Sequence, residues 1–212
     1  MTAERADDLA KVEQEVRACP LCDLSRTRKR AVPGEGPIDA EVFFIGEGPG
    51  FNEDQQGRPF VGPAGRLLNE LLASIGLDRS KVYITNVVKC RPPDNRDPMP
   101  QEITACAPYL ERQLAAIKPK VVVTLGRYSM AKFFAGASIT KIHGQPKRIG
   151  HTFYFPMLHP AAALRQESYM AAVKADMLKI PALLEEARKA DGVAGADEVQ
   201  EEVPTQLGLF DL

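Results

Sequence analysis

The chain has 212 residues, of which 44% are hydrophobic and 26% charged, a composition that fits a folded globular domain and excludes a disordered or fibrous chain. No run of about 18 apolar residues occurs, and the N-terminal residues carry too much charge for a signal peptide, so we expect no membrane span and no export. Residues 1–184 carry 25 Lys and Arg against 20 Asp and Glu, whereas residues 185–212 carry 2 against 8. The basic body suits either a polyanionic partner or ordinary solvated surface.

Hydrophobic spacing predicts helices and strands in a regular order along the chain. Residues 5–18 have apolar side chains at helical spacing and lead into a tight Cys-Pro-Leu-Cys turn. Four short runs rich in β-branched and aromatic residues then predict buried strands, at residues 41–46, 82–87, 121–126 and 152–156. Helical patterns lie between and after them, at residues 63–75, 100–117, 127–134 and, for most of its length, 161–188.

The alternation of strands and helices predicts an α/β fold, in which a mainly parallel sheet has helices on both faces. We expect one domain over residues 1–188. An acidic tail follows at residues 189–212 and begins as a disordered linker, because it has few large apolar side chains. Ligands of such sheets bind at the carboxyl ends of the strands, so the loops that follow the strands are expected to carry the chemistry.

Four cysteines are the first sign of a bound group. A chain without an export signal keeps its thiols reduced, so a metal or a cluster is a better expectation than disulfides. Cys19 and Cys22 share one tight turn, whereas Cys90 and Cys106 follow far along the chain with 15 residues between them. Four thiolates suit tetrahedral zinc or a [4Fe–4S] cluster, and the widely spaced pair favours the cluster. Buried cysteines without a ligand are a third, weaker alternative.

Polar side chains follow three of the predicted strands. The first strand leads into a glycine-rich loop that carries Glu47 and, a little further on, Glu53. This loop lacks the lysine with which phosphate-binding loops hold nucleotides. The second strand ends in Asn86, and the fourth leads into His159. We therefore expect a carboxylate, an amide and an imidazole to meet at one edge of the sheet.

Several segments together resemble one known family. The four-cysteine spacing, GEGPG with EDQQGRPFVGPAGRLL after it, NVVKCRPPDNRDP and HPAAALR have the order and spacing of the family 4 uracil-DNA glycosylases, over roughly residues 15–180. The resemblance implies a three-layer α/β/α domain with a four-stranded, mainly parallel sheet. It also implies a DNA-repair enzyme that excises uracil from DNA, with a structural [4Fe–4S] cluster on the four cysteines and no catalytic metal.

The resemblance implies roles for individual residues. Phe60 would stack on the flipped uracil, Asn86 would bind its N3–H and O4, and Gly48 would let the backbone approach closely. His159 would lie near O2, where a hydrogen bond strengthens as the departing base becomes anionic. The residues by themselves leave plainer alternatives: Asn86 as a cap of the strand end, Phe60 as a core residue and His159 as a partner of backbone groups.

Further roles follow from the same resemblance. Glu47 or Glu53 would orient the attacking water or stabilise the cationic sugar. Leu164 and Arg165 would form the wedge that enters the minor groove and holds the stack open after the base has flipped. Two other functions are alternatives: a non-hydrolytic protein that binds or cross-links uracil-containing DNA, and an iron–sulfur electron-transfer protein. Residues 91–105 contain no histidine for such a cross-link, which favours turnover.

The tail ends in an apolar pattern formed by Gln206, Leu207, Leu209 and Phe210. This pattern is similar to the peptide with which proteins bind the bacterial sliding clamp. A flexible tether would raise the local concentration of the protein on clamp-loaded DNA, and packing of the tail on the body is the alternative. We expect a monomer that acts in the cytoplasm, in association with the nucleoid.

Overall fold

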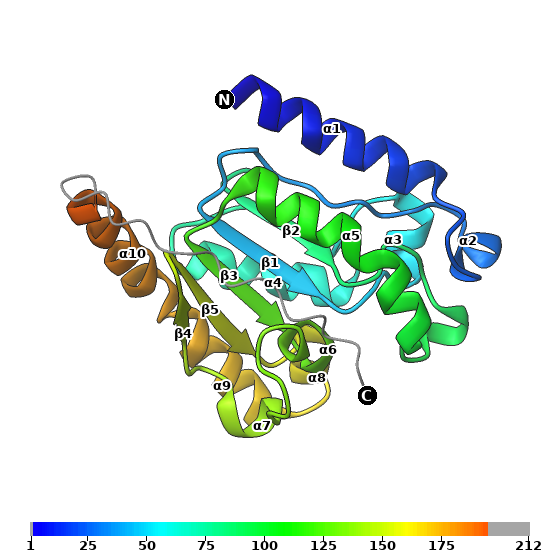
Figure 1. Ribbon diagram of the computed structural model, residues 1–212. Helices are drawn as coiled ribbons and strands as arrows, with labels where there is room; N and C mark the ends of the chain where they lie inside the picture. The colour runs from blue at the N-terminus through cyan, green and yellow to red at the C-terminus, as the bar shows by residue number, and fades with distance from the viewer. Residues whose placement is uncertain (1, 195–212) are drawn as a thin grey trace.

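A five-stranded sheet in the order β2-β1-β3-β5-β4 forms the middle layer of the protein, whose computed structural model describes residues 2–194 (Figure 1). Strands β2, β1, β3 and β5 are parallel, and β4 is antiparallel to β5. The strands are β1 (Val42–Gly46), β2 (Val82–Asn86), β3 (Val121–Leu125), β4 (Lys147–Ile149) and β5 (Thr152–Met157). Every residue of β1, β2 and β3 is buried, which explains why continuous apolar runs mark them in the sequence.

Helices cover both faces of the sheet (Figure 1). One face carries α1 (Thr2–Ala18), α2 (Leu24–Thr27) and α5 (Pro100–Ile117). The other face carries α4 (Pro63–Ser74), α8 (Pro160–Ala163), α9 (Glu167–Met177) and α10 (Ile180–Ala194). Shorter helices lie in the connections: α3 (Phe51–Gln56), the 3-10 turn η1 (Pro93–Asn95), α6 (Arg127–Ala131) and α7 (Ile139–Ile142).

Each face of the sheet has its own hydrophobic core. Val12 and Val16, one turn apart on α1, are buried in the same cluster as Leu110 of α5. On the opposite face, Leu68 and Leu72 of α4 are also one turn apart and fully buried. This spacing gives each helix one apolar stripe, which packs toward the sheet. The helices are thereby fixed as layers, and the loops at the carboxyl ends of the strands are left to build the site.

The predicted α/β fold is confirmed, and the four predicted strands are present. The structure adds β4, whose three residues are all exposed and therefore give no apolar signal in the sequence. The helical region after the last strand is divided into three helices. The last of them, α10, continues to Ala194, so the predicted domain boundary between residues 188 and 189 falls inside a helix.

The predicted tail motif cannot be placed in this fold. The motif lies outside the described residues, at Gln206, Leu207, Leu209 and Phe210. Within residues 2–194, no helix combines the length and the apolar character that a bilayer crossing needs.

Candidate active site

Asn86 and Gly46 stand opposite each other at the carboxyl ends of β2 and β1. Asn86 is only 1% exposed, and its Oδ1 is buried without a hydrogen-bond partner among the described residues. A Cβ on Gly46 would lie 2.4 Å from this oxygen and 2.6 Å from Cζ of Phe60. Only glycine therefore leaves room beside the amide. A buried acceptor without a donor is costly, so the amide is suited to a ligand that brings a donor.

Phe60 lies beside this amide in an unusual backbone conformation. Its φ is 51°, in the left-handed region that a bulky side chain rarely adopts, and the residue is 6% exposed. Its ring stacks on the ring of His159, with 5.7 Å between the centroids. Gly65 is a second close approach, because a Cβ there would lie 1.8 Å from the carbonyl oxygen of Phe60. The fold thus holds this ring against the ends of the strands.

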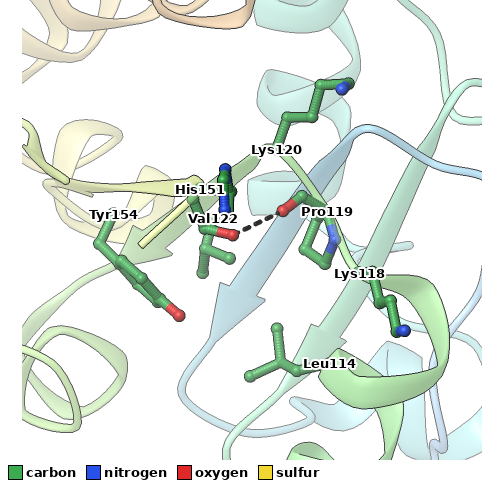
Figure 2. A pocket seen from close by; sticks show the side chains of 8 residues that line it. Leu114, Lys118, Pro119, Lys120, Val122, His151 and Tyr154 are labelled. Carbon is green, nitrogen blue, oxygen red and sulfur yellow. Dashed lines mark hydrogen bonds between the residues drawn. The ribbon is translucent and has the colours of Figure 1, made fainter. Parts of the chain in front are cut away.

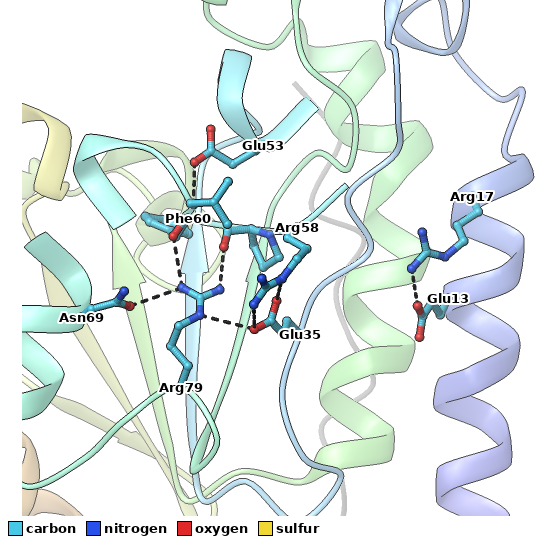
Figure 3. Close-up of polar contacts among 10 residues, drawn as sticks. Glu13, Arg17, Glu35, Glu53, Arg58, Phe60, Asn69 and Arg79 are labelled. Atoms are coloured by element: carbon cyan, nitrogen blue, oxygen red, sulfur yellow. Dashed lines mark hydrogen bonds and ion pairs between the residues drawn. The ribbon is translucent and has the colours of Figure 1, made fainter. Parts of the chain in front are cut away.

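Arg79, which is itself bound by Glu35, holds the backbone of Phe60 (Figure 3). Arg79 donates to the carbonyl oxygens of Pro59 at 2.7 Å and of Phe60 at 3.1 Å. Its Nε also donates to Glu35 at 3.3 Å, and Glu35 accepts two further hydrogen bonds of 2.8 Å from Arg58. The guanidinium satisfies two carbonyl groups at the position where the chain has positive φ. Arg79 is therefore a positioning residue for Phe60.

The carboxylate of Glu53 accepts three hydrogen bonds from backbone N–H groups. Its Oε1 accepts hydrogen bonds from the N–H groups of Val61 and Gly62, both at 2.8 Å. Its Oε2 accepts a third from the N–H of Gly50 at 3.2 Å. The carboxylate thus ties the first turn of α3 to the segment that follows Phe60 (Figure 3). This arrangement fixes the shape of the site and leaves Glu53 little freedom to orient water.

Glu47 differs from Glu53 in its exposure and in its hydrogen bonds. It follows Gly46 directly, is partly exposed, and its side chain has no hydrogen-bond partner among the described residues. Partial burial raises the pKa of the Glu47 carboxyl, the negative charge of Asp97 adds to this, and Arg127 opposes it. Of the two predicted carboxylates, Glu47 is the one available to a substrate or a water.

His159 lies at the start of α8, just after β5. Its Nδ1 accepts a hydrogen bond from the N–H of Ala161 at 3.1 Å, so in the neutral ring the proton sits on Nε2. Burial lowers the pKa of His159 to about 4, although the charge of Glu53 acts in the other direction. At neutral pH the imidazole is therefore an uncharged donor through Nε2. His159 is thus a partner of a backbone group, as the simpler alternative predicted, and the same contact sets the tautomer of the ring.

The other predicted residues have different surroundings. A Cβ on Gly48 would lie 2.8 Å from Cγ2 of Val88, so its missing side chain lets the loop pack against the segment that follows β2. Leu164 follows α8 and is 49% exposed, a high value for a leucine, and Arg165 beside it is also exposed. Their exposure leaves both residues accessible to a partner.

All four cysteines line one small pocket between α1, α5 and the end of β2. Its lining is Val16, Cys19, Leu21, Cys22, Ser25, Arg28, Lys89, Cys90, Ala105, Cys106 and Tyr109. Arg28 donates to Sγ of Cys90 at 3.0 Å, and the N–H of Lys89 donates to Sγ of Cys106 at 3.3 Å. The pocket thus offers four thiols together with N–H donors directed at sulfur.

The thiols stand around the pocket rather than at one point. Within residues 2–194, no three His, Cys, Asp or Glu side chains are close enough to ligate a single ion. A [4Fe–4S] cluster does not need such closeness, because each of its four thiolates binds a different iron. Four thiols with N–H donors at sulfur are a donor set that fits such a cluster.

A buried lysine connects this pocket to the strand ends. Lys89 is 1% exposed, and its ammonium donates to the carbonyl oxygen of Asn86 at 2.8 Å and to Gln113 Oε1 at 2.7 Å. Burial lowers its pKa to about 7, against the effect of nearby thiolates. The residue fixes the backbone of Asn86 to α5. Sequence patterns did not single it out, since a lysine beside a cysteine normally lies at the surface.

A second, larger opening lies at the opposite end of the sheet (Figure 2). Its lining is Leu114, Lys118, Pro119, Lys120, Val122, His151, Thr152 and Tyr154. Val121 and Thr152 begin β3 and β5, so this opening is at the amino ends of the strands. None of the predicted site residues lines it, which separates it from the candidate active site.

Gly46 and Arg79 belong to the candidate site, and sequence patterns missed both of them. Gly46 is the last residue of β1, and the parallel register pairs it with Asn86. The ends of two predicted neighbouring strands were the signal that could have found it. Arg79 precedes β2 in a polar turn, and nothing in the local sequence indicates that it reaches back to Phe60. Its role depends on contacts between segments about twenty residues apart.

The fold and the site define an α/β domain with a ligand site at the carboxyl ends of parallel strands, where domains of this class place their chemistry. Asn86, Phe60 and His159 meet there, and Glu47 follows the neighbouring strand. Residues 33–182 match the model of the family described as "Uracil DNA glycosylase superfamily". The chain belongs to this family.

Relatives match most of the chain. The type-4 uracil-DNA glycosylase of Sulfurisphaera tokodaii is 49% identical over 184 residues, which cover 82% of this chain and 84% of that protein. That of Archaeoglobus fulgidus is 45% identical over 186 residues, covering 84% and 92%. That of Thermotoga maritima is 47% identical over 160 residues, covering 74% and 83%. The family resemblance stated from the motifs is thereby confirmed.

Proposed function

We propose that this protein is a uracil-DNA glycosylase, which hydrolyses the N-glycosidic bond of uracil in DNA and leaves an abasic site. The observation that carries the proposal is the buried, unpartnered amide oxygen of Asn86 beside Phe60 and His159. Uracil presents a flat face for stacking and an N3–H for this oxygen. The membership of the chain in the superfamily, and relatives named type-4 uracil-DNA glycosylase, support the same activity.

Recognition in this proposal begins after the uracil has left the DNA stack. The base enters edge first between the ends of β1 and β2 and stacks on Phe60. Asn86 accepts the N3–H through Oδ1 and donates through Nδ2 to O4. Gly46 lets the amide and the ring lie against the end of β1. Gly48 brings the backbone of the loop close to the base. Leu164 and Arg165 fill the gap that the flipped nucleotide leaves in the DNA.

Bond cleavage separates charge, and the site has a group for each sign. As the bond breaks, the uracil becomes anionic and the sugar gains oxocarbenium character. The Nε2–H of His159 donates to O2, where the negative charge develops, and the neutral ring keeps this proton in place. Glu47 stabilises the cationic sugar and orients the water that adds to its anomeric carbon. Glu53 holds the loop through its three backbone contacts.

An oligonucleotide assay tests the activity. The protein is incubated with a labelled strand that contains one uracil, and the product is treated with alkali to cleave abasic sites. We expect a cleaved strand, an intact thymine control and multiple turnovers per protein. A stable covalent adduct would instead indicate a cross-linking protein, and an unchanged strand would overturn the proposed function.

We propose that Cys19, Cys22, Cys90 and Cys106 hold a structural [4Fe–4S] cluster. The support is the single pocket that all four line and the donors from Arg28 and the Lys89 backbone, which stabilise thiolate sulfur. The cluster supplies cross-links between segments and takes no part in bond cleavage. Anaerobically purified protein should contain about four irons and absorb broadly in the visible. One zinc and no iron would contradict the cluster.

We propose that the end of the tail binds a bacterial sliding clamp. The support is the sequence pattern alone, formed by Gln206, Leu207, Leu209 and Phe210. A peptide of residues 204–212 should bind such a clamp in fluorescence polarisation, and alanine at both Leu209 and Phe210 should abolish binding. A variant without residues 195–212 should excise uracil from naked oligonucleotides at the rate of the full chain. On clamp-loaded DNA it should be slower than the full chain. Equal rates on both substrates would contradict recruitment.

A further inference from the structure

Phe51 is a large apolar side chain that remains in solvent. It is the first residue of α3, directly after the loop that carries Glu47, and it is 56% exposed. The guanidinium of Arg91 lies over its ring, 5.3 Å from the centroid. An exposed ring beside an arginine is the combination with which proteins bind unpaired bases of nucleic acids.

The arginine of this pair is oriented by its own loop. Arg91 Nε donates to Asn95 Oδ1 at 2.8 Å, and Asn95 stands in a left-handed turn with a φ of 53°. Because one edge of the guanidinium is engaged, its plane has a defined direction over Phe51. The two flat groups therefore form a preorganised surface, which loses less side-chain entropy on binding than two free side chains would.

The pair lies at the rim of the candidate active site. In the same turn of α3, Glu53 binds the backbone N–H groups that follow Phe60. On the other side, Pro92, which follows Arg91, lies beside Gly48, since a Cβ there would be 3.8 Å from Pro92 Cδ. The exposed pair is thus attached to both segments that frame the candidate active site. A strand with its uracil in this site would pass close to the pair.

We propose that Phe51 and Arg91 form a stacking site for a nucleobase that neighbours the uracil in the same DNA strand. This proposal rests on the proposed function, because it requires a uracil-containing strand in the pocket. Flipping of the uracil removes one stacking partner from its neighbour. The neighbouring base stacks on Phe51, and Arg91 adds its charge near the phosphate. The site accepts any base, since every base has a flat face, and it favours single strands, whose neighbours are unpaired.

The test removes the base and the ring separately. Single-stranded oligonucleotides carry one uracil and, on its 5′ or its 3′ side, either a normal nucleotide or a base-free tetrahydrofuran nucleotide. We expect wild-type kcat/KM to fall about tenfold when the base on one side is missing, the order expected of one base–aromatic stack. Phe51→Ala should lose about tenfold on the intact strand and nothing further on the base-free strand. Phe51→Tyr keeps a ring and should behave as wild type.

Two controls make the outcome decisive. Ile149 is also an exposed apolar residue, but it pairs with the first residue of β5 at the opposite end of the sheet. Ile149→Ala should therefore match wild type on every strand. Since Phe51 is exposed, its variants should also unfold at the wild-type temperature.

The stacking site would be overturned if the effect of the missing base did not depend on the ring of Phe51. If the missing base costs Phe51→Ala as much as it costs wild type, or if Phe51→Ala stays within about twofold of wild type on the intact strand, no base binds there. Wild-type excision of the intact strand is the reference. Its absence would overturn the proposed function, whereas excision without coupling overturns the stacking site alone.

Discussion

Asn86 combines two properties that are costly together, since it is buried and its amide oxygen has no partner among the described residues. Gly46 has no side chain, which lets Oδ1 and the ring of Phe60 pack directly against the end of β1. A residue that only capped the strand would satisfy its own oxygen. In the proposed function, the N3–H of uracil supplies the missing donor.

We predict that Asn86→Ala loses about 10²–10³ in kcat/KM for uracil excision, which is about 2.7–4 kcal/mol of transition-state stabilisation. Affinity for DNA without uracil should change little, because phosphate contacts dominate it. Steady-state kinetics and a filter-binding titration measure the two effects. A variant that excises uracil within a few fold of wild type would show that the base binds elsewhere.

His159 gives a prediction for the dependence of stability on pH. Burial lowers its pKa to about 4 in the folded state, whereas an unfolded chain has the ordinary value of about 6.5. As pH falls from 7 to 4, the unfolded state binds a proton near pH 6.5 and the folded state does not. Stability is therefore lost with falling pH across this window and does not change further from this residue below pH 4.

The matched variant is His159→Gln, whose amide can still donate but does not titrate. In urea unfolding, we expect wild type to lose more stability than His159→Gln between pH 7 and pH 5. The two proteins have all other titratable groups in common, so the difference reports the ring of His159. Equal losses would show that the ring titrates normally in the folded state. Excision by wild type should show no inflection from this ring near pH 6.5.

At the scale of elements, the segment from Gly57 to Gly62 has to present a ring from a strained backbone. Two residues hold it from opposite sides: Arg79, before β2, binds its carbonyls, and Glu53, on α3, binds its N–H groups. Positive φ at a bulky residue costs energy that such contacts offset. The loop is therefore stable only in the assembled fold.

We predict that Arg79→Ala destabilises the protein by about 1–3 kcal/mol, because two part-buried carbonyl oxygens lose their donor. Uracil excision should fall as well, mainly through a higher KM, since Phe60 is no longer fixed. The matched control is Arg58→Ala, because Arg58 binds the same Glu35 from a mostly exposed position and such pairs contribute little. If both variants behave alike in urea unfolding and kinetics, Arg79 does not position the ring.

At the scale of the whole molecule, the two cores have different supports. The core that contains α4, α9 and α10 consists of large aliphatic and aromatic side chains. The core on the face of α1 and α5 includes Cys90 and Cys106 themselves, with Cys19 and Cys22 packed against it. A group bound by these thiols joins the N-terminal helix, the end of β2 and α5.

We predict that Cys106→Ser lowers the unfolding temperature, by about 2–4 °C for each kcal/mol lost in a chain of this length. Hydrogen exchange should accelerate first in α1 and α2, because they depend on the pocket, and later in α4 and α9. Calorimetry and exchange measured by mass spectrometry check the two parts. Wild-type stability in a variant that binds no iron would contradict a structural role for the cysteines.

The sequence by itself determined the type and order of most elements. Continuous β-branched runs mark the four parallel strands, and i, i+4 apolar spacing marks α1, α4 and α5, because burial on a sheet requires these patterns. It also predicted that Asn86, His159 and Glu47 meet, since the carboxyl ends of parallel strands lie at one edge. The sequence did not predict β4, because an exposed edge strand of three residues carries no apolar pattern.

Only the tertiary structure decided how the site is supported. The motif presents Glu47 and Glu53 alike, and only the structure shows that the backbone N–H groups of Val61 and Gly62 engage the carboxylate of Glu53. The reach of Arg79 to Phe60 and the meeting of all four cysteines in one pocket were likewise decided by packing. The physical reason is that local patterns report which residues are buried, whereas a hydrogen bond depends on the positions of atoms from segments that are distant in the chain.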